Sequence, residues 1–220
     1  MSGNGPVWLY LHGFASGPRS SKAQAFRAWG EARGIAIDAL DLRVPSLSGL
    51  RFSAIKRRVR EAIDAAGERS RAVLIGSSLG GLTACRVAEE DPRVCAVFAM
   101  APAFQLVARW RERLGAEAWE AWRRDGSLAI DDHVTKKKAS IDFGFVEELA
   151  SLDVGFPDVR VPVCIVHGTK DEVVAVDGSR EWARGKRHVR LVEVEDGHDL
   201  AASIPRILSE FDAFTEPLKA

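Results

Sequence analysis

The chain has 220 residues, of which 46% are hydrophobic, so it is long enough to bury a large core, and we expect one domain over residues 1–220. Its 31 basic and 31 acidic residues cancel to a formal charge of zero, which argues against nucleic acid or an anionic membrane surface as a partner. The N-terminal apolar run lacks a basic segment before it and is too short for a signal sequence or a membrane span, so we expect a cytoplasmic protein. The cysteines Cys85, Cys95 and Cys164 stand far apart and predict neither a disulfide framework nor a zinc site.

Short apolar runs rich in β-branched residues recur along the chain, with longer helical patterns between them. The runs cover residues 7–11, 35–40, 72–75, 94–100, 161–166 and 189–194, and the helical patterns cover residues 21–33, 50–66, 79–90, 176–184 and 200–214. This alternation predicts an α/β fold with a mainly parallel, doubly wound sheet of about six strands. In such a sheet, sites lie beyond the carboxyl ends of the strands.

A GxSxG pattern follows the third apolar run, where the expected strand turns into a helix. Residues 76–80 read G-S-S-L-G, and Gly81 follows. A turn sharp enough to lift a serine hydroxyl above the sheet leaves no room for side chains two residues on either side, which explains Gly76 and Gly80. No lysine follows Gly80, as a phosphate-binding P-loop would require. The pattern therefore indicates a nucleophile elbow with Ser78 as the nucleophile.

A serine hydroxyl is a weak nucleophile at neutral pH and needs a neighbouring base, which in turn needs an orienting acid. Asp171 lies in the loop after the fifth apolar run, and His198 lies in the loop after the sixth. Both follow the carboxyl ends of expected strands, as Ser78 does, so the three side chains are expected to meet. Glu172 and Asp177 are the alternatives to Asp171 as the acid. We therefore expect a catalytic triad of Ser78, His198 and Asp171.

Acyl transfer also needs two N–H donors at the position where negative charge develops on the substrate oxygen. The backbone N–H of Leu79, directly after the nucleophile, is expected to supply one donor of this oxyanion hole. The second is expected in the loop after the first strand, residues 11–17, where the N–H of Phe14 is the best candidate. His12 in this loop and His167 each precede a glycine at a strand end, and we interpret both as structural hydrogen-bonding residues.

One segment, residues 103–160, is too long to be a single crossover between strands. It contains Trp110, Trp119 and Trp122, together with a lysine run at 136–138 that we interpret as a solvated turn. We expect a small helical cap over the sheet rather than a second domain, because its flanks lack a flexible linker. On a helical wheel Trp110 lies on the apolar stripe, whereas Trp119 points away from it. Trp119 is therefore a candidate for the wall of a substrate pocket, and packing within the insertion is the equal alternative.

These motifs together resemble the α/β-hydrolase superfamily, whose triads run Ser, Asp, His along the chain. The resemblance rests on residues 11–14, 76–81, 167–171 and 197–198, and it spans nearly the whole chain. Residues 10–14, followed by S-G-P-R-S-S-K-A at 16–23, are similar to the opening of the small bacterial YqiA-like esterases, which lack so long an insertion before the acid loop. The insertion resembles instead the capped acyl thioesterases and lipases, in which a small lid shapes the acyl pocket.

The residues and the resemblance together favour a serine hydrolase that cleaves a carboxylic ester, with a thioester as the close variant, through an acyl-enzyme on Ser78. No metal and no organic cofactor are implied, and the expected partner is a small-molecule ester or thioester. An acyltransferase with the same triad is an alternative, because fold and triad do not fix the acceptor. A non-catalytic, ligand-binding protein of the same fold is the alternative from another class. Acyl chain length, leaving group and oligomeric state do not follow from the sequence.

Overall fold

The structure is a computed structural model that describes residues 5–67 and 70–218. The strands are β1 (Val7–Leu11), β2 (Ile37–Leu40), β3 (Ala72–Ser77), β4 (Val94–Met100), β5 (Ser127–Asp132), β6 (Lys137–Asp142), β7 (Val163–Gly168) and β8 (Val189–Val194). The helices are α1 (Ser21–Glu31), α2 (Phe52–Ala65), α3 (Leu79–Glu90), α4 (Leu106–Asp125), α5 (Gly144–Leu152), α6 (Asp177–Ala183) and α7 (Ile204–Thr215), with a short 3₁₀ turn at Glu216–Leu218. Within the described ranges, no helix combines the length and the apolar character of a membrane span.

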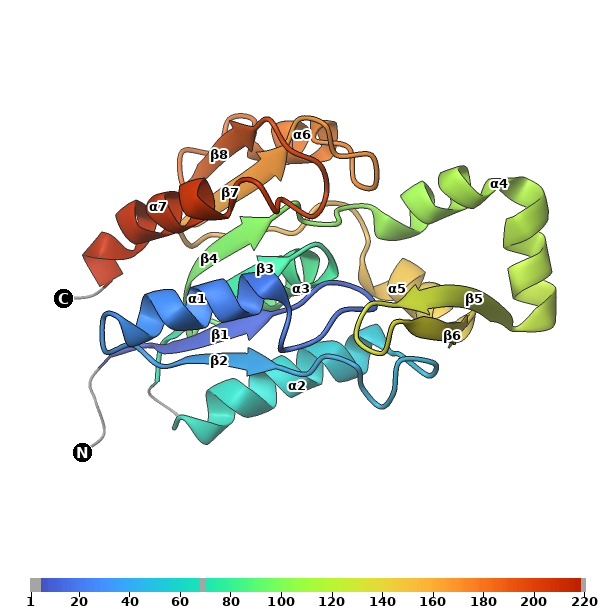
Figure 1. The fold of residues 1–220 in the computed structure, drawn as a ribbon, viewed down its shortest axis with the longest axis horizontal. Coiled ribbons are helices and arrows are strands. Elements are labelled where there is room, and N and C mark those ends of the chain that lie inside the picture. Colours follow the sequence, from blue (N-terminus) through green and yellow to red (C-terminus); the bar gives the residue numbers. More distant parts are fainter. Residues whose placement is uncertain (1–4, 68–69, 219–220) are drawn as a thin grey trace.

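The main sheet confirms the predicted parallel, doubly wound arrangement (Figure 1). Over the described residues it has six strands in the order β2-β1-β3-β4-β7-β8, and each neighbouring pair is parallel. The chain runs outward from β1 to β2 and then returns to the other side of β1 for β3. The order therefore reverses between β1 and β3, and the crevice outside the carboxyl ends of these two strands is where sheets of this kind place their sites.

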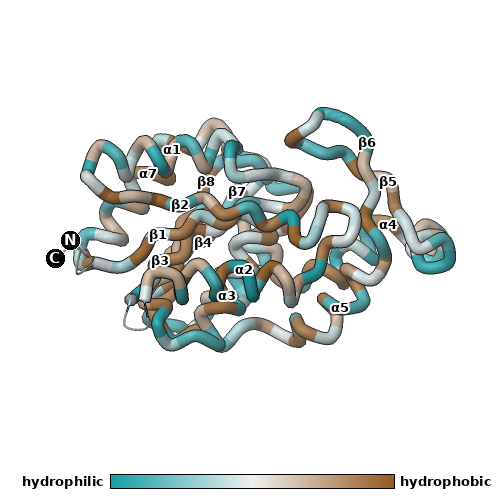
Figure 2. The backbone as a smooth tube through the Cα atoms, turned by 90° about the horizontal axis from the view of Figure 1, so that it is seen from below, coloured by the Kyte–Doolittle hydropathy of each residue, from teal (hydrophilic) through white to brown (hydrophobic). Residues whose placement is uncertain are grey.

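Helices cover both faces of the sheet, which explains why its central strands, β1, β3, β4 and β7, read as nearly continuous apolar runs. The edge strands β2 and β8 contain charged residues. Figure 2 shows α1 and α7 on one side of the sheet and α2 and α3 on the other. Successive residues of β1 point to opposite faces: Trp8 belongs to the core beside α1 and α7, and Leu9 belongs to the core beside α2 and α3. In the first of these cores, Phe211 of α7 packs edge-on against Trp8 and Phe26, with ring centroids 5.9 and 4.9 Å apart. The sheet is thus packed on both faces, and a site at the strand ends is built on this packed support.

The segment between β4 and β7 lies beyond the carboxyl ends of the sheet strands (Figure 1). It contains the expected helices, α4 and α5, but it is not purely helical, because β5 and β6 pair as an antiparallel hairpin. In β5, Leu128 and Ile130 alternate with exposed residues and turn toward the core of the insertion, the period-2 pattern of a strand with one buried face. Within the lysine run, Lys136 ends the turn with a left-handed φ of 59° and Lys138 is already in β6, where it pairs with Asp131.

Helix α4 is interrupted at Gly115, and this interruption invalidates the helical wheel drawn through it. Gly115 has φ 75° and ψ 166°, a backbone conformation that residues other than glycine rarely adopt. It ends one helical arm of α4, and the second arm begins after it. Trp110 lies before the break and Trp119 lies after it, so the two do not share one helical phase. Trp119 is buried rather than turned outward, and its ring packs edge-on against Trp122 and Phe143.

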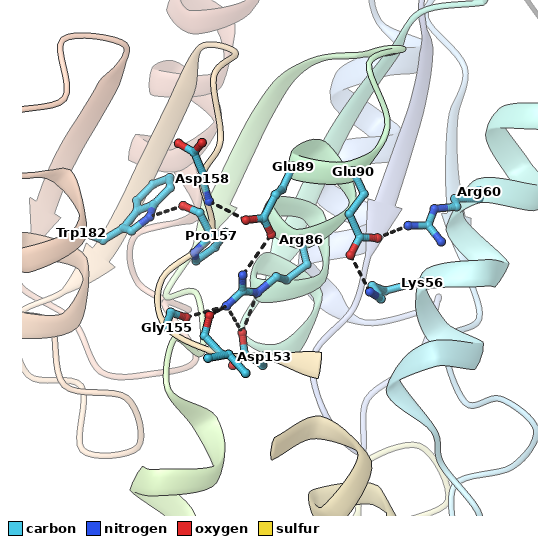
Figure 3. Close-up of polar contacts among 11 residues, drawn as sticks. Lys56, Arg60, Arg86, Glu89, Glu90, Asp153, Gly155, Pro157, Asp158 and Trp182 are labelled. Atoms are coloured by element: carbon cyan, nitrogen blue, oxygen red, sulfur yellow. Dashed lines mark hydrogen bonds and ion pairs between the residues drawn. The ribbon is translucent and has the colours of Figure 1, made fainter. Parts of the chain in front are cut away.

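The return of the insertion to the sheet is fixed by an arginine on α3 (Figure 3). The buried Arg86 binds the Asp153 carboxylate at 2.7 Å and the carbonyl of Gly155 at 2.5 Å. Next along the chain, Trp182 of α6 donates its indole N–H to the carbonyl of Pro157 at 2.9 Å. Because these partners come from α3 and α6, the segment before β7 is held against two helices of the main fold.

Candidate active site

Ser78 stands in a strained turn between β3 and α3. Its φ is 54° and its ψ is −115°, a conformation that non-glycine residues rarely adopt and that is typical of nucleophile elbows. A Cβ on Gly76 would lie 2.3 Å from the carbonyl oxygen of Gly80, and a Cβ on Gly80 would lie 2.1 Å from the carbonyl oxygen of Leu11. Both clashes are with backbone atoms, so the turn requires glycine at both positions. The turn leaves Ser78 half-buried at the carboxyl edge of the sheet.

A row of hydrogen bonds joins Ser78 to the two residues expected beside it. His198 Nε2 lies 3.0 Å from Ser78 Oγ, and His198 Nδ1 lies 2.7 Å from Asp171 Oδ2. The carboxylate can only accept, so Nδ1 carries the proton and Nε2 is left to accept the serine hydroxyl proton. The Asp171 side chain is fully buried and the His198 side chain is 21% exposed, so the row runs from the interior to a surface that a substrate can reach.

The charge of Asp171 is stabilised by donors on both of its oxygens. Oδ1 accepts the backbone N–H groups of Val173 at 2.9 Å and Val174 at 2.7 Å. Burial by itself raises the pKa of Asp171, but hydrogen bonds from His167, His198 and the Val174 N–H outweigh burial and hold the pKa well below its usual value. Asp171 is therefore a carboxylate at neutral pH.

Neither alternative acid forms a hydrogen bond with His198, whose ring nitrogens are bound to Asp171 and Ser78. Glu172 is exposed, and Asp177 is an exposed residue of α6 whose carboxylate pairs with Arg180 at 2.9 Å. His167 is fully buried, and its Nε2 lies 2.8 Å from the carbonyl of Val174, so it braces the turn that carries Asp171. Of the acids considered from the sequence, the structure brings Asp171 alone into hydrogen-bond contact with the histidine beside Ser78.

His12 orders the loop after β1, from which the second oxyanion donor is expected. Its Nδ1 lies 2.8 Å from the Gly13 carbonyl, and its Nε2 accepts the N–H of Leu42 at 3.0 Å. Burial lowers the pKa of His12, which agrees with a neutral ring whose Nε2 is an acceptor. A Cβ on Gly13 would lie 3.3 Å from the Cβ of Ser78, so the loop lies directly against the elbow.

The two expected oxyanion donors flank this contact. Leu79 is the first residue of α3, where an N–H has no partner within the helix. Phe14 follows Gly13, and its ring packs against Trp110 of α4 with centroids 4.9 Å apart and against Phe145 of α5 at 6.1 Å. The insertion therefore packs directly on the loop that carries Phe14, and it does so through Trp110, the tryptophan that sequence reasoning assigned to the apolar stripe.

Trp119 lies in the wall of a cavity of about 1140 Å³ between the two arms of α4 and α5. The walls of this cavity do not include Ser78, Asp171 or His198. The structure thus places Trp119 in the packing of the insertion, and it does not bring Trp119 together with the other expected site residues.

Contacts that the sequence did not suggest hold the hairpin and α1 to the site. At the hairpin tip, the His133 N–H donates to the Ala15 carbonyl at 3.0 Å, and the Asp132 carboxylate accepts from Arg43 at 2.8 Å. Although burial raises it, the pKa of Asp132 is lowered to about 2 by the Val134 N–H and by further donors that include Arg43. Across the site, Lys22 of α1 donates to the carbonyl of Asp199, the residue after His198, at 2.7 Å. The only indication in the sequence that Lys22 lies near the site was its place in the stretch at 16–23, which resembles YqiA-like esterases.

The described residues contain no group of three or more histidine, cysteine or acidic side chains arranged to hold a metal ion. Comparison with solved structures identifies the class: the chain has the α/β-hydrolase fold. It is similar to α/β-hydrolase domain-containing protein 10 from mouse, with 23% identity, a TM-score of 0.80, and coverage of 99% of this chain and 92% of that one. It is also similar to Est1E from Butyrivibrio proteoclasticus, with 18% identity, a TM-score of 0.75, and coverage of 97% and 88%. It is similar as well to an esterase from Pyrococcus furiosus, with 17% identity, a TM-score of 0.63, and coverage of 100% of this chain and 85% of that one.

The sequence itself places the chain in a family. It belongs to UPF0227, an uncharacterised protein family whose model matches residues 7–215. The solved structures confirm the α/β-hydrolase fold that the motifs suggested. No curated protein matches the sequence.

Proposed function

We propose that this protein is a serine hydrolase that cleaves carboxylic esters or thioesters of small or acyl-chain substrates through an acyl-enzyme on Ser78. The observation that carries the proposal is the row of two hydrogen bonds, 3.0 Å from Ser78 Oγ to His198 Nε2 and 2.7 Å from His198 Nδ1 to Asp171 Oδ2. A hydroxyl, an imidazole and a buried carboxylate in this order make up the machinery for activating a serine nucleophile.

In the first half of the reaction, Ser78 Oγ attacks the carbonyl carbon of the ester as His198 Nε2 takes the hydroxyl proton. The developing oxyanion would be bound by the N–H groups of Leu79 and Phe14. His198 then gives its proton to the departing alcohol or thiol, and the acyl group remains on Ser78. In the second half, water attacks the acyl-enzyme through the same histidine, which releases the carboxylic acid and restores Ser78.

Asp171 acts through His198 rather than on the substrate. Its carboxylate fixes the proton on Nδ1 and stabilises the imidazolium that forms when His198 accepts the serine proton. The N–H groups of Val173 and Val174 hold Oδ1, so Oδ2 is presented to the ring. The names of the solved relatives, which are those of hydrolases and esterases, support the same general class.

The test is covalent labelling with a fluorophosphonate, combined with turnover of p-nitrophenyl butanoate and of a butanoyl thioester. Ser78→Ala should lose labelling and turnover while it keeps its circular dichroism and melting temperature, because the covalent step has no other nucleophile. Ser77→Ala is the matched control, since Ser77 is the adjacent serine and is buried at the end of β3. A folded Ser78→Ala protein with parent turnover would exclude this mechanism. Comparing the ester with the thioester then shows which bond is preferred.

A further inference from the structure

A second cavity lies beside the loop after β1 and has no part in the chemistry described above. It has a volume of about 920 Å³, which is within the range of small-molecule sites. Three segments form it: the stretch from Ser16 into α1, the end of β2 with the segment after it, and the tip of the β5–β6 hairpin. These segments are distant in the chain and meet only in the folded structure.

The walls of this cavity are strongly cationic. They contain the side chains of Arg19, Arg27, Arg43 and Lys136 and a single carboxylate, Asp41. Arg43 is held by Asp132 at 2.8 Å, whereas the other three cations form no ion pair with any residue that the structure describes. Because the whole chain has a formal charge of zero, this concentration of unpaired positive charge is a local feature of the cavity.

The cavity adjoins the reacting serine through the loop that carries Phe14. Gly13 lies against Ser78, and the N–H of Ser16, which lines the cavity, donates to the Gly13 carbonyl at 3.2 Å. The hairpin tip contributes His133, Val134 and Lys136 to the walls, and the His133 N–H donates to the Ala15 carbonyl at 3.0 Å. The cavity walls do not themselves include Ser78, Asp171 or His198, so a substrate with its ester carbonyl at Ser78 would have to span this loop to place another group in the cavity.

The lining points to phosphate as the group bound. A guanidinium group can bind two phosphate oxygens at once, and the hydroxyls of Ser16 and Ser21 are further donors in the walls. A phosphate monoester carries about −1.5 to −2 charges at pH 7. It therefore matches several unpaired cations better than a ligand with a single carboxylate would. The aromatic surface of Phe14 and Trp110 offers the apolar contact that an acyl chain needs, so the cationic cavity is left for the other half of the ester.

We propose that this cavity binds a phosphate group carried by the alcohol or thiol portion of the substrate. The proposal rests on the hydrolase function proposed above and names the class of its substrate: an acyl ester of a phosphorylated leaving group. Arg19 and Arg27 contribute the charge that no carboxylate of the described chain neutralises, so they are the residues to change.

The first measurement does not depend on catalysis. Binding of inorganic phosphate and of glycerol 3-phosphate is measured by isothermal titration calorimetry on the parent, on Ser78→Ala and on the double variant Arg19→Gln/Arg27→Gln. Arg187→Gln is the matched control, because Arg187 is an exposed cation before β8 that lines no part of this cavity and forms no ion pair within the described residues. The parent, Ser78→Ala and the control should bind alike, and the double variant should bind at least about tenfold more weakly.

The second measurement compares two substrates that differ only in the phosphate, 1-butanoylglycerol and 1-butanoylglycerol 3-phosphate. The parent should have a kcat/KM at least about tenfold higher for the phosphorylated ester, and in the double variant the ratio of the two kcat/KM values should fall to about one. Raising the salt concentration should reduce the preference as well.

Absence of phosphate binding, or equal binding by the parent and the double variant, would overturn the proposal. Equal kcat/KM values for the two esters in the parent would overturn it too. If neither ester is hydrolysed but phosphate binding is lost in the double variant, the hydrolase function fails and the anion site stands, so the two failures are distinguishable.

Discussion

Replacing Asp171 by asparagine tests the site most directly, because the structure dictates how the new amide must lie. Two backbone N–H groups, from Val173 and Val174, point at Oδ1 of Asp171. They will hold the amide oxygen of Asp171→Asn there, which turns the NH₂ group toward His198. An NH₂ group donates, so Nδ1 of His198 must accept and the ring proton moves to Nε2. The ring then directs a proton at Ser78 and can no longer take one from it.

The expected loss follows from this change of tautomer. When a triad acid is replaced in this way, kcat falls by about 10⁴, which corresponds to about 5 kcal/mol of transition-state stabilisation. The assay is steady-state hydrolysis of p-nitrophenyl butanoate at saturating substrate, with thermal unfolding to show that the variant is folded. Glu172→Gln is the control, since Glu172 is the exposed neighbour of Asp171. A loss smaller than tenfold in Asp171→Asn, or a large loss in Glu172→Gln, would refute the assignment.

Three further predictions concern stability. Arg86→Met should lower the free energy of unfolding by about 3–5 kcal/mol because it leaves the Asp153 carboxylate, only 3% exposed, without its cation, and Arg86→Met/Asp153→Leu should recover most of that loss in urea titrations. Trp119→Ala should cost about 3 kcal/mol, measured in the same way, and leave the acyl chain-length preference unchanged, because the cavity it lines does not include the serine; a changed preference with unchanged stability would contradict this. Asp132→Asn should lower the melting temperature at pH 7 but not near pH 2. The pKa of Asp132 is about 2 in the folded state and about 3.9 in the unfolded state, so the carboxylate stabilises the fold above about pH 4. This contribution is lost as the pH falls toward 2.

The sheet and the Ser78 row were predictable because their signals are local. Each strand buried on both faces leaves an unbroken apolar run, and the glycines of the elbow are required by clashes within one turn. Helix α7 was expected from residue 200 but begins at Ile204, because Leu200 has a left-handed φ of 54° and Pro205 is suited to the first turn of a helix.

The insertion was harder to predict because its structure depends on contacts distant in sequence. The kink at Gly115 changes which face of α4 is buried. A single glycine within a helical pattern does not by itself predict such a break, because helices tolerate isolated glycines. The hairpin has short, half-exposed strands and no Asn-Gly or Asp-Gly turn, so its pattern is weak. The cationic cavity takes Arg19, Arg43 and Lys136 from three separate segments, and no spacing in the sequence signals their meeting.

The hydrogen bond between Ser78 and His198 spans 120 positions of the chain, and this separation governs when chemistry becomes available during folding. During synthesis the elbow can form between β1, β3 and β4 while the base and its acid are still absent. Under the proposed function, Ser78 would therefore stay inactive until β7 and β8 have added to the far edge of the sheet. Parallel strand pairs form slowly when they close long loops. In a refolding experiment, the return of ester hydrolysis would therefore report the docking of β7 and β8 onto the rest of the sheet.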